Sequence, residues 1–265
     1  MDLGLSGKAA VVTGGSEGIG YAAARSLAAE GARVVICARR EDVLEGAARR
    51  LAEETGGEVV PVAADVSRVE GVERLMQTAL DRFGRLDALV NNAGTSRAAK
   101  FETVTDAAWQ EDLDLKLFGA IRTCRLAIPA MRQAGGGSIV SVLNIGAKQP
   151  GAASVPTSVS RAAGMALTKA LSKELAPEQI RVNAVLIGLV KSGQHERAWR
   201  ARGGPDSGQS LEAFYAGMAQ QRGVPLGRVA EAQEAGDLIA YLCSPRAAYI
   251  TGTAVNFDGG ASAVI

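Results

Sequence analysis

Three glycines at fixed spacing mark the first stretch of the chain that could do chemistry. In VVTGGSEGIG (residues 11–20) an apolar run ends at a glycine, and two more glycines open a segment of helical period. Such glycines permit a tight turn and a close approach to phosphate, and a helix N-terminus adds unpaired N–H groups and partial positive charge. In this strand–turn–helix setting the pattern indicates a dinucleotide site. The residues predicted to bind there are Gly14, Ser16, Glu17, Gly18, Ile19 and Gly20.

Two arginines after the second apolar run indicate which dinucleotide the site prefers. The run RVVICA (33–38) ends without the carboxylate that would accept a hydrogen bond from a ribose 2′-hydroxyl. Arg39 and Arg40 follow instead, and two guanidinium groups suit a 2′-phosphate, so NADPH is favoured over NADH. The alternative is a solvated basic pair at a helix start. Glu17 favours that alternative, because a carboxylate near the phosphate would repel it.

The elements that must position these residues alternate along the chain. Short Val/Ile/Ala-rich runs predict strands at 8–14, 33–38, 58–65, 86–94, 137–143, 180–188 and 253–257. Segments of helical period predict helices at 18–31, 41–54, 68–83, 106–132, 157–175 and 230–244. Continuously apolar strands separated by helices predict an α/β fold: a doubly wound parallel sheet of about seven strands, with helices on both faces. Its ligand crevice lies at the carboxyl ends of the strands.

The segment at about 189–228 differs from the rest of the single domain predicted for residues 1–265. It is polar, Gly-rich and poor in strand signal, and it precedes the last helix. A long insertion at this place predicts a lid over the substrate. A tolerated surface loop is the alternative, although Trp199, Phe214 and Tyr215 suggest that the segment packs on something.

Composition excludes several other classes of protein. The 265 residues include 29 basic and 28 acidic side chains, so no net field favours nucleic acid or an anionic membrane. No apolar run approaches the length that spans a bilayer, and the first residues do not read as a signal peptide. Three distant cysteines and one histidine argue against a disulfide framework or a metal site. We therefore expect a cytoplasmic protein that holds no metal.

Several motifs together resemble the short-chain dehydrogenase/reductase superfamily over essentially the whole chain. They are the glycine turn Thr13–Gly20, Asp65 with Val66, the N-N-A-G stretch Asn91–Gly94, IRVNAV (180–185) and ITGTAVNFDGG (250–260). The resemblance implies a Rossmann-type domain that assembles as a homotetramer or homodimer through the helices near 106–132 and 157–175. It also implies that Asp65 and Val66 hold the adenine ring, and that Asn91, Ala93 and Gly94 contact the cofactor.

The residues that normally perform the family's chemistry are all replaced. The resemblance places Lys116 at the usual Asn, Asn144 at the Ser, Thr157 at the Tyr and Arg161 at the Lys. None of the four tyrosines is followed four residues later by lysine, so no Y-x-x-x-K exists in this chain. Thr157 ionises far too weakly to act as a phenol does, and Arg161 cannot release its proton but can hold ribose hydroxyls.

Lys116 is the candidate for the missing acid. If the family geometry holds, its ammonium lies near Arg161, and like charge with partial burial would lower its pKa from about 10.4 towards neutrality. A lysine tuned in this way is a competent general acid, and Asn144 would donate a hydrogen bond to the substrate oxygen. The alternative is that Lys116 pairs with a carboxylate or reaches solvent. Tyr215 and His195 are weaker candidates that would reach in from the lid.

The loop after the sixth strand departs from the family as well. Ile187–Gly188 stands where the family often has Pro-Gly, and Ser192 stands where a Thr or Ser bonds the nicotinamide carboxamide. Gly188 still permits a close approach to the cofactor, but without proline the loop is expected to be more mobile when no cofactor is bound.

Two functions fit an intact nucleotide site beside a rewritten catalytic site. The first is an NADPH-dependent oxidoreductase that reduces a small carbonyl compound with a non-standard proton donor. Two cations at the nicotinamide further suggest an anionic substrate. The alternative is an NADP(H)-binding sensor or partner subunit without turnover. The polar and charged replacements favour the enzyme, because an abandoned pocket is filled more cheaply by apolar side chains. Non-redox lyase chemistry is disfavoured, since it needs no glycine turn.

Overall fold

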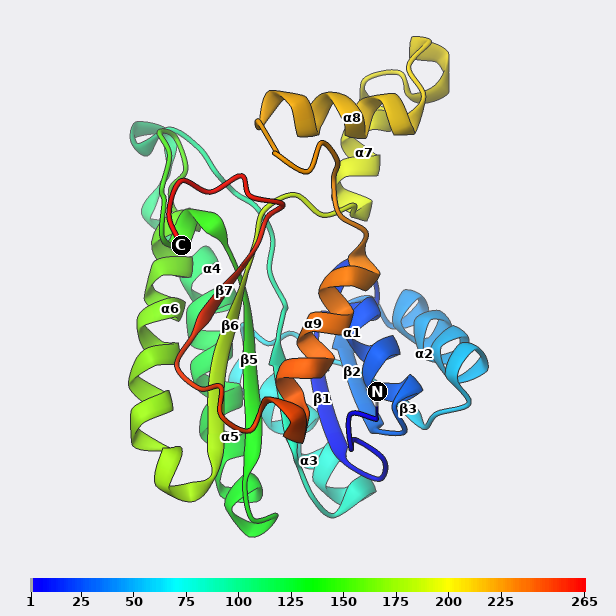
Figure 1. Ribbon diagram of the computed structural model, residues 1–265, viewed down its shortest axis with the longest axis vertical. Helices are drawn as coiled ribbons and strands as arrows, with labels where there is room; N and C mark the ends of the chain where they lie inside the picture. Colours follow the sequence, from blue (N-terminus) through cyan, green and yellow to red (C-terminus); the bar gives the residue numbers. More distant parts are fainter. Residues whose placement is uncertain (1) are drawn as a thin grey trace.

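A seven-stranded parallel sheet forms the centre of the molecule. The computed structural model describes residues 2–265 (Figure 1). Its strands are β1 (Ala9–Thr13), β2 (Arg33–Ala38), β3 (Val59–Ala63), β4 (Ala88–Asn91), β5 (Gly137–Asn144), β6 (Ile180–Ile187) and β7 (Ala254–Phe257). Their order in the sheet is β3-β2-β1-β4-β5-β6-β7. The predicted doubly wound α/β fold is confirmed.

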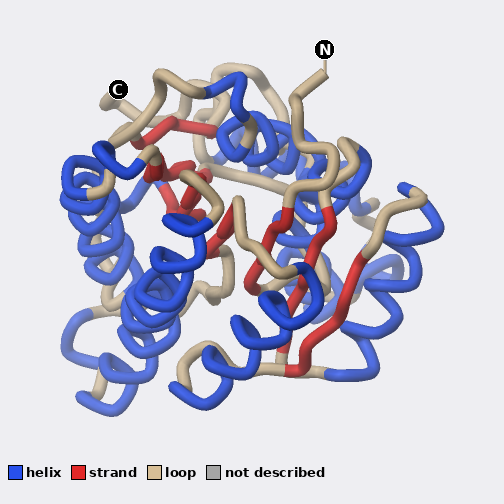
Figure 2. The backbone as a smooth tube through the Cα atoms, turned by 90° about the horizontal axis from the view of Figure 1, so that it is seen from below, coloured by secondary structure: helices blue, strands red, loops and turns tan. Residues whose placement is uncertain are grey.

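Helices cover both faces of this sheet (Figure 2). They are α1 (Gly18–Ala29), α2 (Glu41–Thr55), α3 (Val69–Phe83), α4 (Asp106–Leu113), α5 (Gly119–Gln133), α6 (Thr157–Glu174), α7 (Gly193–Ala201), α8 (Leu211–Gln221) and α9 (Ala232–Cys243). Helices α1, α2 and α9 share one apolar layer with the sheet, and α3 and α5 share the opposite layer. Helix α6 packs on the second face beside β5 and β6.

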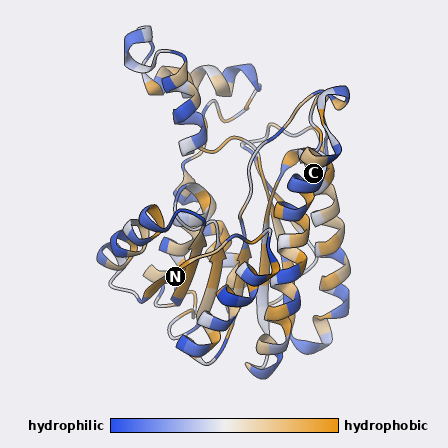
Figure 3. Cartoon of the chain, turned by 180° about the vertical axis from the view of Figure 1, so that it is seen from behind, coloured by the Kyte–Doolittle hydropathy of each residue, from blue (hydrophilic) through white to orange (hydrophobic). Residues whose placement is uncertain are grey.

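The alternation of side chains along each strand divides the core between the two layers. Val11 and Val35 are paired in register and pack towards α3 and α5, whereas the next pair, Val12 and Ile36, packs towards α1 and α2. Because both faces are covered, every residue of β1 is buried, which explains the continuous apolar run in the sequence. Figure 3 shows the same contrast, with apolar strands enclosed by helices that carry their polar residues outside.

The long helix predicted at 106–132 is present and contains a π-helical turn. Between α4 and α5 the chain forms a π-helical turn over Asp114–Phe118, in which the Gly119 N–H bonds to the Asp114 carbonyl, five residues earlier. A π-turn holds one residue more than an α-turn and is frequent at functional sites. The predicted helix is therefore confirmed, since the chain is helical from Asp106 to Gln133, and the side chain of Lys116 leaves the backbone from the π-turn.

Two helices, α7 and α8, occupy the inserted segment at 189–228. They stand beyond the carboxyl ends of the strands, away from the body of the sheet (Figure 1). Five buried residues form a small core of their own in and around α8: Phe214, Tyr215, Ala219, Val224 and Val229. Trp199 of α7 packs against this core. Among the described residues, none of the helices is long and apolar enough to cross a membrane.

Candidate active site

The glycine turn between β1 and α1 forms a cradle that side chains would fill. Gly14 adopts a positive φ of 68° and Gly18 one of 61°. A Cβ on Gly20 would lie 2.2 Å from the Gly14 carbonyl oxygen, so this close packing of helix on turn admits only glycine. Glu17 precedes α1 without capping it through its side chain. The first amides of α1 therefore remain available to an anion such as a pyrophosphate.

Asn92 braces this turn from the neighbouring strand. Its Nδ2 donates to the Gly14 carbonyl at 3.1 Å, and its backbone N–H donates to Thr13 Oγ1 at 2.9 Å. Thr13 Oγ1 in turn donates to the Val90 carbonyl at 3.3 Å. Asn92 was not among the residues predicted to form the site, although it lies within the N-N-A-G stretch. Asn91 instead faces α5, where its Oδ1 accepts a hydrogen bond from Thr123 at 2.7 Å.

Charged side chains surround the end of β2. Arg39 and Arg40 are both exposed there. Glu17 lies 3.5 Å from a guanidinium nitrogen of Arg40 and 3.5 Å from one of Arg197 on α7. These pairs are about half exposed, and such pairs contribute little to stability, so a phosphate could displace Glu17 from Arg40 at small cost.

Three other residues predicted to contact a cofactor have structural partners. Asp65 Oδ1 accepts hydrogen bonds from the Ser67 N–H at 2.9 Å and the Ser67 hydroxyl at 2.7 Å. Gly188 packs so closely that a Cβ on it would lie 2.6 Å from the Asp258 Cβ. The Ser192 hydroxyl caps the N-terminus of α7. These contacts fix the backbone at the carboxyl edge of the sheet, where a dinucleotide would lie.

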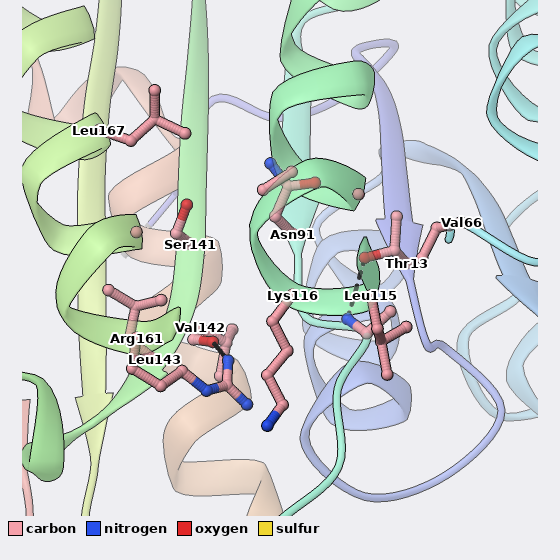
Figure 4. Close-up of a pocket in the computed structure, with 14 residues that line it drawn as sticks. Thr13, Val66, Asn91, Leu115, Lys116, Ser141, Val142, Leu143, Arg161 and Leu167 are labelled. Atoms are coloured by element: carbon pink, nitrogen blue, oxygen red, sulfur yellow. Dashed lines mark hydrogen bonds between the residues drawn. The ribbon is translucent and has the colours of Figure 1, made fainter. Parts of the chain in front are cut away.

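A small cavity of about 20 Å³ lies at the same edge, beside the π-turn and α6 (Figure 4). Lys116 and Arg161 approach it from opposite sides, with both nitrogen-bearing ends directed towards the same opening (Figure 4). Asn91, Ala93 and Val66 are also in its lining. Gly94 lies against Arg161, so closely that a Cβ on Gly94 would be 2.7 Å from the guanidinium.

Lys116 is buried and donates two hydrogen bonds. One goes to a carboxylate oxygen of Asp112, one helical turn earlier, and the other to Thr157 Oγ1 at 3.1 Å. Burial lowers the pKa of Lys116 to about 8, the Asp112 carboxylate opposes that change, and Arg161 adds to it. Lys116 thus has a carboxylate partner, as expected for a structural ion pair, and also a lowered pKa, as expected for a general acid.

Thr157, at the first turn of α6, accepts two hydrogen bonds. The Arg97 backbone N–H donates to its Oγ1 at 3.0 Å, in addition to the Lys116 ammonium. A hydroxyl has two acceptor lone pairs and one hydrogen to donate. With both lone pairs engaged, the hydroxyl can still donate its hydrogen, and it makes no such hydrogen bond within residues 2–265.

Arg161 and Asn144 each carry a buried polar atom without a partner. Arg161 donates to the Val142 carbonyl at 2.6 Å, but its Nε makes no hydrogen bond within the described part of the chain. The same holds for Asn144 Oδ1, at the end of β5. Burial lowers the pKa of Arg161 to about 10, so its guanidinium stays charged at neutral pH. Buried polar atoms are rarely left unpaired, and these two favour a polar ligand at the site.

Of the residues considered for the chemistry, Lys116 and Arg161 line this cavity, and Thr157 and Asn144 do not, although Thr157 bonds to Lys116. His195 and Tyr215 contact each other, with ring centroids 6.3 Å apart, and neither is among the residues that line the cavity. Two residues that do hold the site escaped the sequence analysis, namely Asp112 and Ser160. Ser160 follows Thr157 by one turn of α6 and donates to Asp112 Oδ2 at 2.7 Å.

The chain matches known proteins over nearly its whole length. Residues 14–262 match the family model described as enoyl-(acyl carrier protein) reductase. Dehydrogenase/reductase SDR family member 4 of Oryctolagus cuniculus is 35% identical over 258 residues, which cover 97% of this chain and 94% of the relative. The human protein of the same name is 34% identical over 257 residues, covering 97% of this chain and 88% of the relative.

Solved structures with bound NADPH share the fold. L-sorbose reductase from Gluconobacter frateurii, complexed with NADPH and L-sorbose, has a TM-score of 0.92 and 37% identity, and the match covers 100% of both chains. A short chain oxidoreductase from Pseudomonas aeruginosa PAO1 containing an atypical catalytic center, also NADPH-bound, has a TM-score of 0.91 and 35% identity, covering 98% of this chain and 99% of that one. Fold, glycine turn and relatives agree: the chain belongs to the short-chain dehydrogenase/reductase superfamily of oxidoreductases.

Proposed function

We propose that this protein is an NADPH-dependent oxidoreductase that reduces a small carbonyl compound with Lys116 as its proton source. The residues fit the cofactor: the amides at the start of α1 suit the pyrophosphate, and Arg39 and Arg40 suit the 2′-phosphate. Arg161, with its unpartnered Nε, suits the ribose hydroxyls. NADPH bound there supplies a hydride to the carbonyl carbon.

The observation that carries this proposal is the hydrogen bond from Lys116 to Thr157. Thr157 donates its free hydrogen to the substrate oxygen and passes that proton on as the carbonyl is reduced. It takes a replacement proton from the Lys116 ammonium, so Thr157 never has to carry a full negative charge. Lys116 ends as a neutral amine, which its lowered pKa of about 8 favours. The Asn144 side chain, at the end of β5, orients the substrate oxygen.

The charges at the cavity favour an anionic substrate. Lys116 and Arg161 contribute two positive charges there, and Asp112 offsets one of them. A carboxylate on the substrate would complement the remaining charge. The segment at 189–228, with α7 and α8 above the strand ends, is suited to act as the lid that excludes water from this site.

Exposed apolar side chains on the π-turn, α5 and α6 support assembly into a homodimer or homotetramer. Phe118, Leu126 and Val159 are 39%, 36% and 45% exposed in the single chain. Burying such side chains between subunits is favourable. The three cysteines are free and buried, which is in keeping with a reducing cytoplasm.

A panel of carbonyl compounds tests the proposal. Purified protein with NADPH is assayed for cofactor oxidation against 2-keto acids, their neutral amides, and L-sorbose, the ligand of one structural relative. The proposal predicts oxidation above the substrate-free rate, faster with keto acids than with the matched amides. NADPH binding without oxidation across the panel would instead support a sensor or partner subunit.

A further inference from the structure

The most completely buried ion pair of the candidate site contains a carboxylate that was not predicted to have a role. Asp112, in the last turn of α4, has a fully buried side chain, with 0% of its surface exposed, and Lys116 has 1% exposed. One carboxylate oxygen accepts from the Lys116 ammonium and the other from the Ser160 hydroxyl at 2.7 Å. Removing a charge from water is costly unless such partners are present, so this arrangement holds all three side chains in place.

The groups around Lys116 act on its charge in opposite directions. Arg161 from α6 and Arg97 from the loop after β4 face it as cations, and burial disfavours its charged form. Thr157 and Ser160, also from α6, are neutral. Among the described residues, Asp112 is the carboxylate that bonds to the Lys116 ammonium and opposes these effects. Without it, two cations and burial would leave Lys116 mostly as the neutral amine at working pH.

We propose that Asp112 is a positioning residue that keeps Lys116 protonated and directed at Thr157, and thereby sets the pH range in which the site can deliver a proton. Its contact with Ser160 ties α4 to α6, so that the ammonium and the Thr157 hydroxyl keep their separation of 3.1 Å. The catalytic consequence rests on the proposed function, whereas the control of the charge on Lys116 does not.

The protonation of Lys116 can be measured without turnover. The chain has seven lysines, so the ε-carbon signals of ¹³C-lysine-labelled, cofactor-free protein are few, and Lys116→Met identifies the signal of interest. We expect Asp112→Asn to lower the titration midpoint of Lys116 by about one pH unit or more, and Asp112→Glu, which keeps the charge, to restore most of it. An unchanged midpoint in Asp112→Asn overturns the proposal. Asp112→Ser, which leaves room for a water, carries the same expectation if the asparagine variant does not fold.

The pH profile of NADPH-dependent turnover separates this inference from the proposed function. If both hold, the basic limb of the kcat profile in Asp112→Asn moves to lower pH by the same amount as the NMR midpoint. A merely structural role for Asp112 would lower activity at every pH without moving the limb. A shifted midpoint with an unmoved kcat profile supports the control of charge by Asp112 and contradicts Lys116 as the proton source.

Discussion

Lys116 Nζ lies 3.1 Å from Thr157 Oγ1, and no tyrosine is among the residues that line the cavity beside Lys116. The hydroxyl that replaces the expected tyrosine is thus in contact with the ammonium that replaces the expected asparagine. An aliphatic hydroxyl is too weak an acid to act alone, but it can relay a proton that a stronger acid supplies. This contact is the reason why we propose Lys116 as the proton source and Thr157 as the relay.

Carbonyl reduction and alcohol oxidation should show opposite dependences of kcat on pH. Carbonyl reduction needs Lys116 protonated, so kcat should fall as the pH rises through about 8, the pKa that burial gives this lysine. Alcohol oxidation by NADP⁺ needs the neutral amine, so its kcat should rise through the same range. Both profiles are measured with one substrate pair. A reduction profile that stays flat until about pH 10, as for a solvated lysine, would contradict the assignment.

Activity should depend on the hydroxyl group of Thr157 and not on the size of its side chain. Thr157→Val keeps the size but removes the relay, and we expect kcat to fall by about 10²-fold or more, as for loss of a general acid. Thr157→Ser keeps the hydroxyl and serves as the matched control, with a loss of less than about 10-fold. Steady-state kinetics of both variants, with NADPH affinity measured in parallel, check this. Equal losses in the two variants would exclude the relay.

Arg40 should discriminate between the two dinucleotides. Arg40→Ala removes a guanidinium from the 2′-phosphate, and a charge-assisted hydrogen bond of about 1.5–3 kcal/mol corresponds to roughly 10–150-fold weaker NADPH binding. NADH binding should stay the same, because it has no such phosphate. Arg49→Ala, which removes another exposed arginine, on α2, is the control. Fluorescence titrations measure both affinities, and an equal effect on NADPH and NADH would refute the role of Arg40.

Gly20 should tolerate no side chain. A Cβ there meets the Gly14 carbonyl oxygen at 2.2 Å, so Gly20→Ala must push the helix start away from the turn. We expect loss of NADPH binding and a lower melting temperature. Gly46→Ala, whose nearest neighbour is the mobile end of Arg50 at 3.6 Å, should bind normally and gain about 0.5–1 kcal/mol of stability from its helical position. Normal binding by Gly20→Ala would mean that the turn is not the dinucleotide site.

The sheet and its order of elements were predictable because each strand is buried on both faces. Continuous runs such as AAVVT and RVVICA leave few other structures open to the chain, and the predicted strand ends differ from the structure by only a few residues. The two helices within residues 189–228 were missed, since glycines dilute their periodicity. Ser192 and Ser210, which each cap one of those helices, were the available signal.

The partners of Lys116 were less accessible to sequence reasoning. Asp112 reads as an ordinary charged residue on a helix surface, and its burial depends on Ser160, 48 residues later in the chain. The π-turn at Asp114–Phe118 likewise depends on a backbone hydrogen bond that no residue pattern predicts. Alignment with the family identified the four altered positions, but only the fold revealed that Lys116, Thr157 and Asp112 form one hydrogen-bonded chain.

Single-turnover reduction by Lys116→Met tests the central claim most directly. Methionine preserves the length and packing of the buried stem but supplies no proton, and Lys173→Met, on the exposed face of α6, is the control. With NADPH affinity unchanged, we predict that the rate of NADPH oxidation by the keto acid falls by about 10²–10⁴-fold in Lys116→Met and not in the control. A Lys116→Met enzyme that oxidises NADPH at the unaltered rate would show that the proton comes from elsewhere.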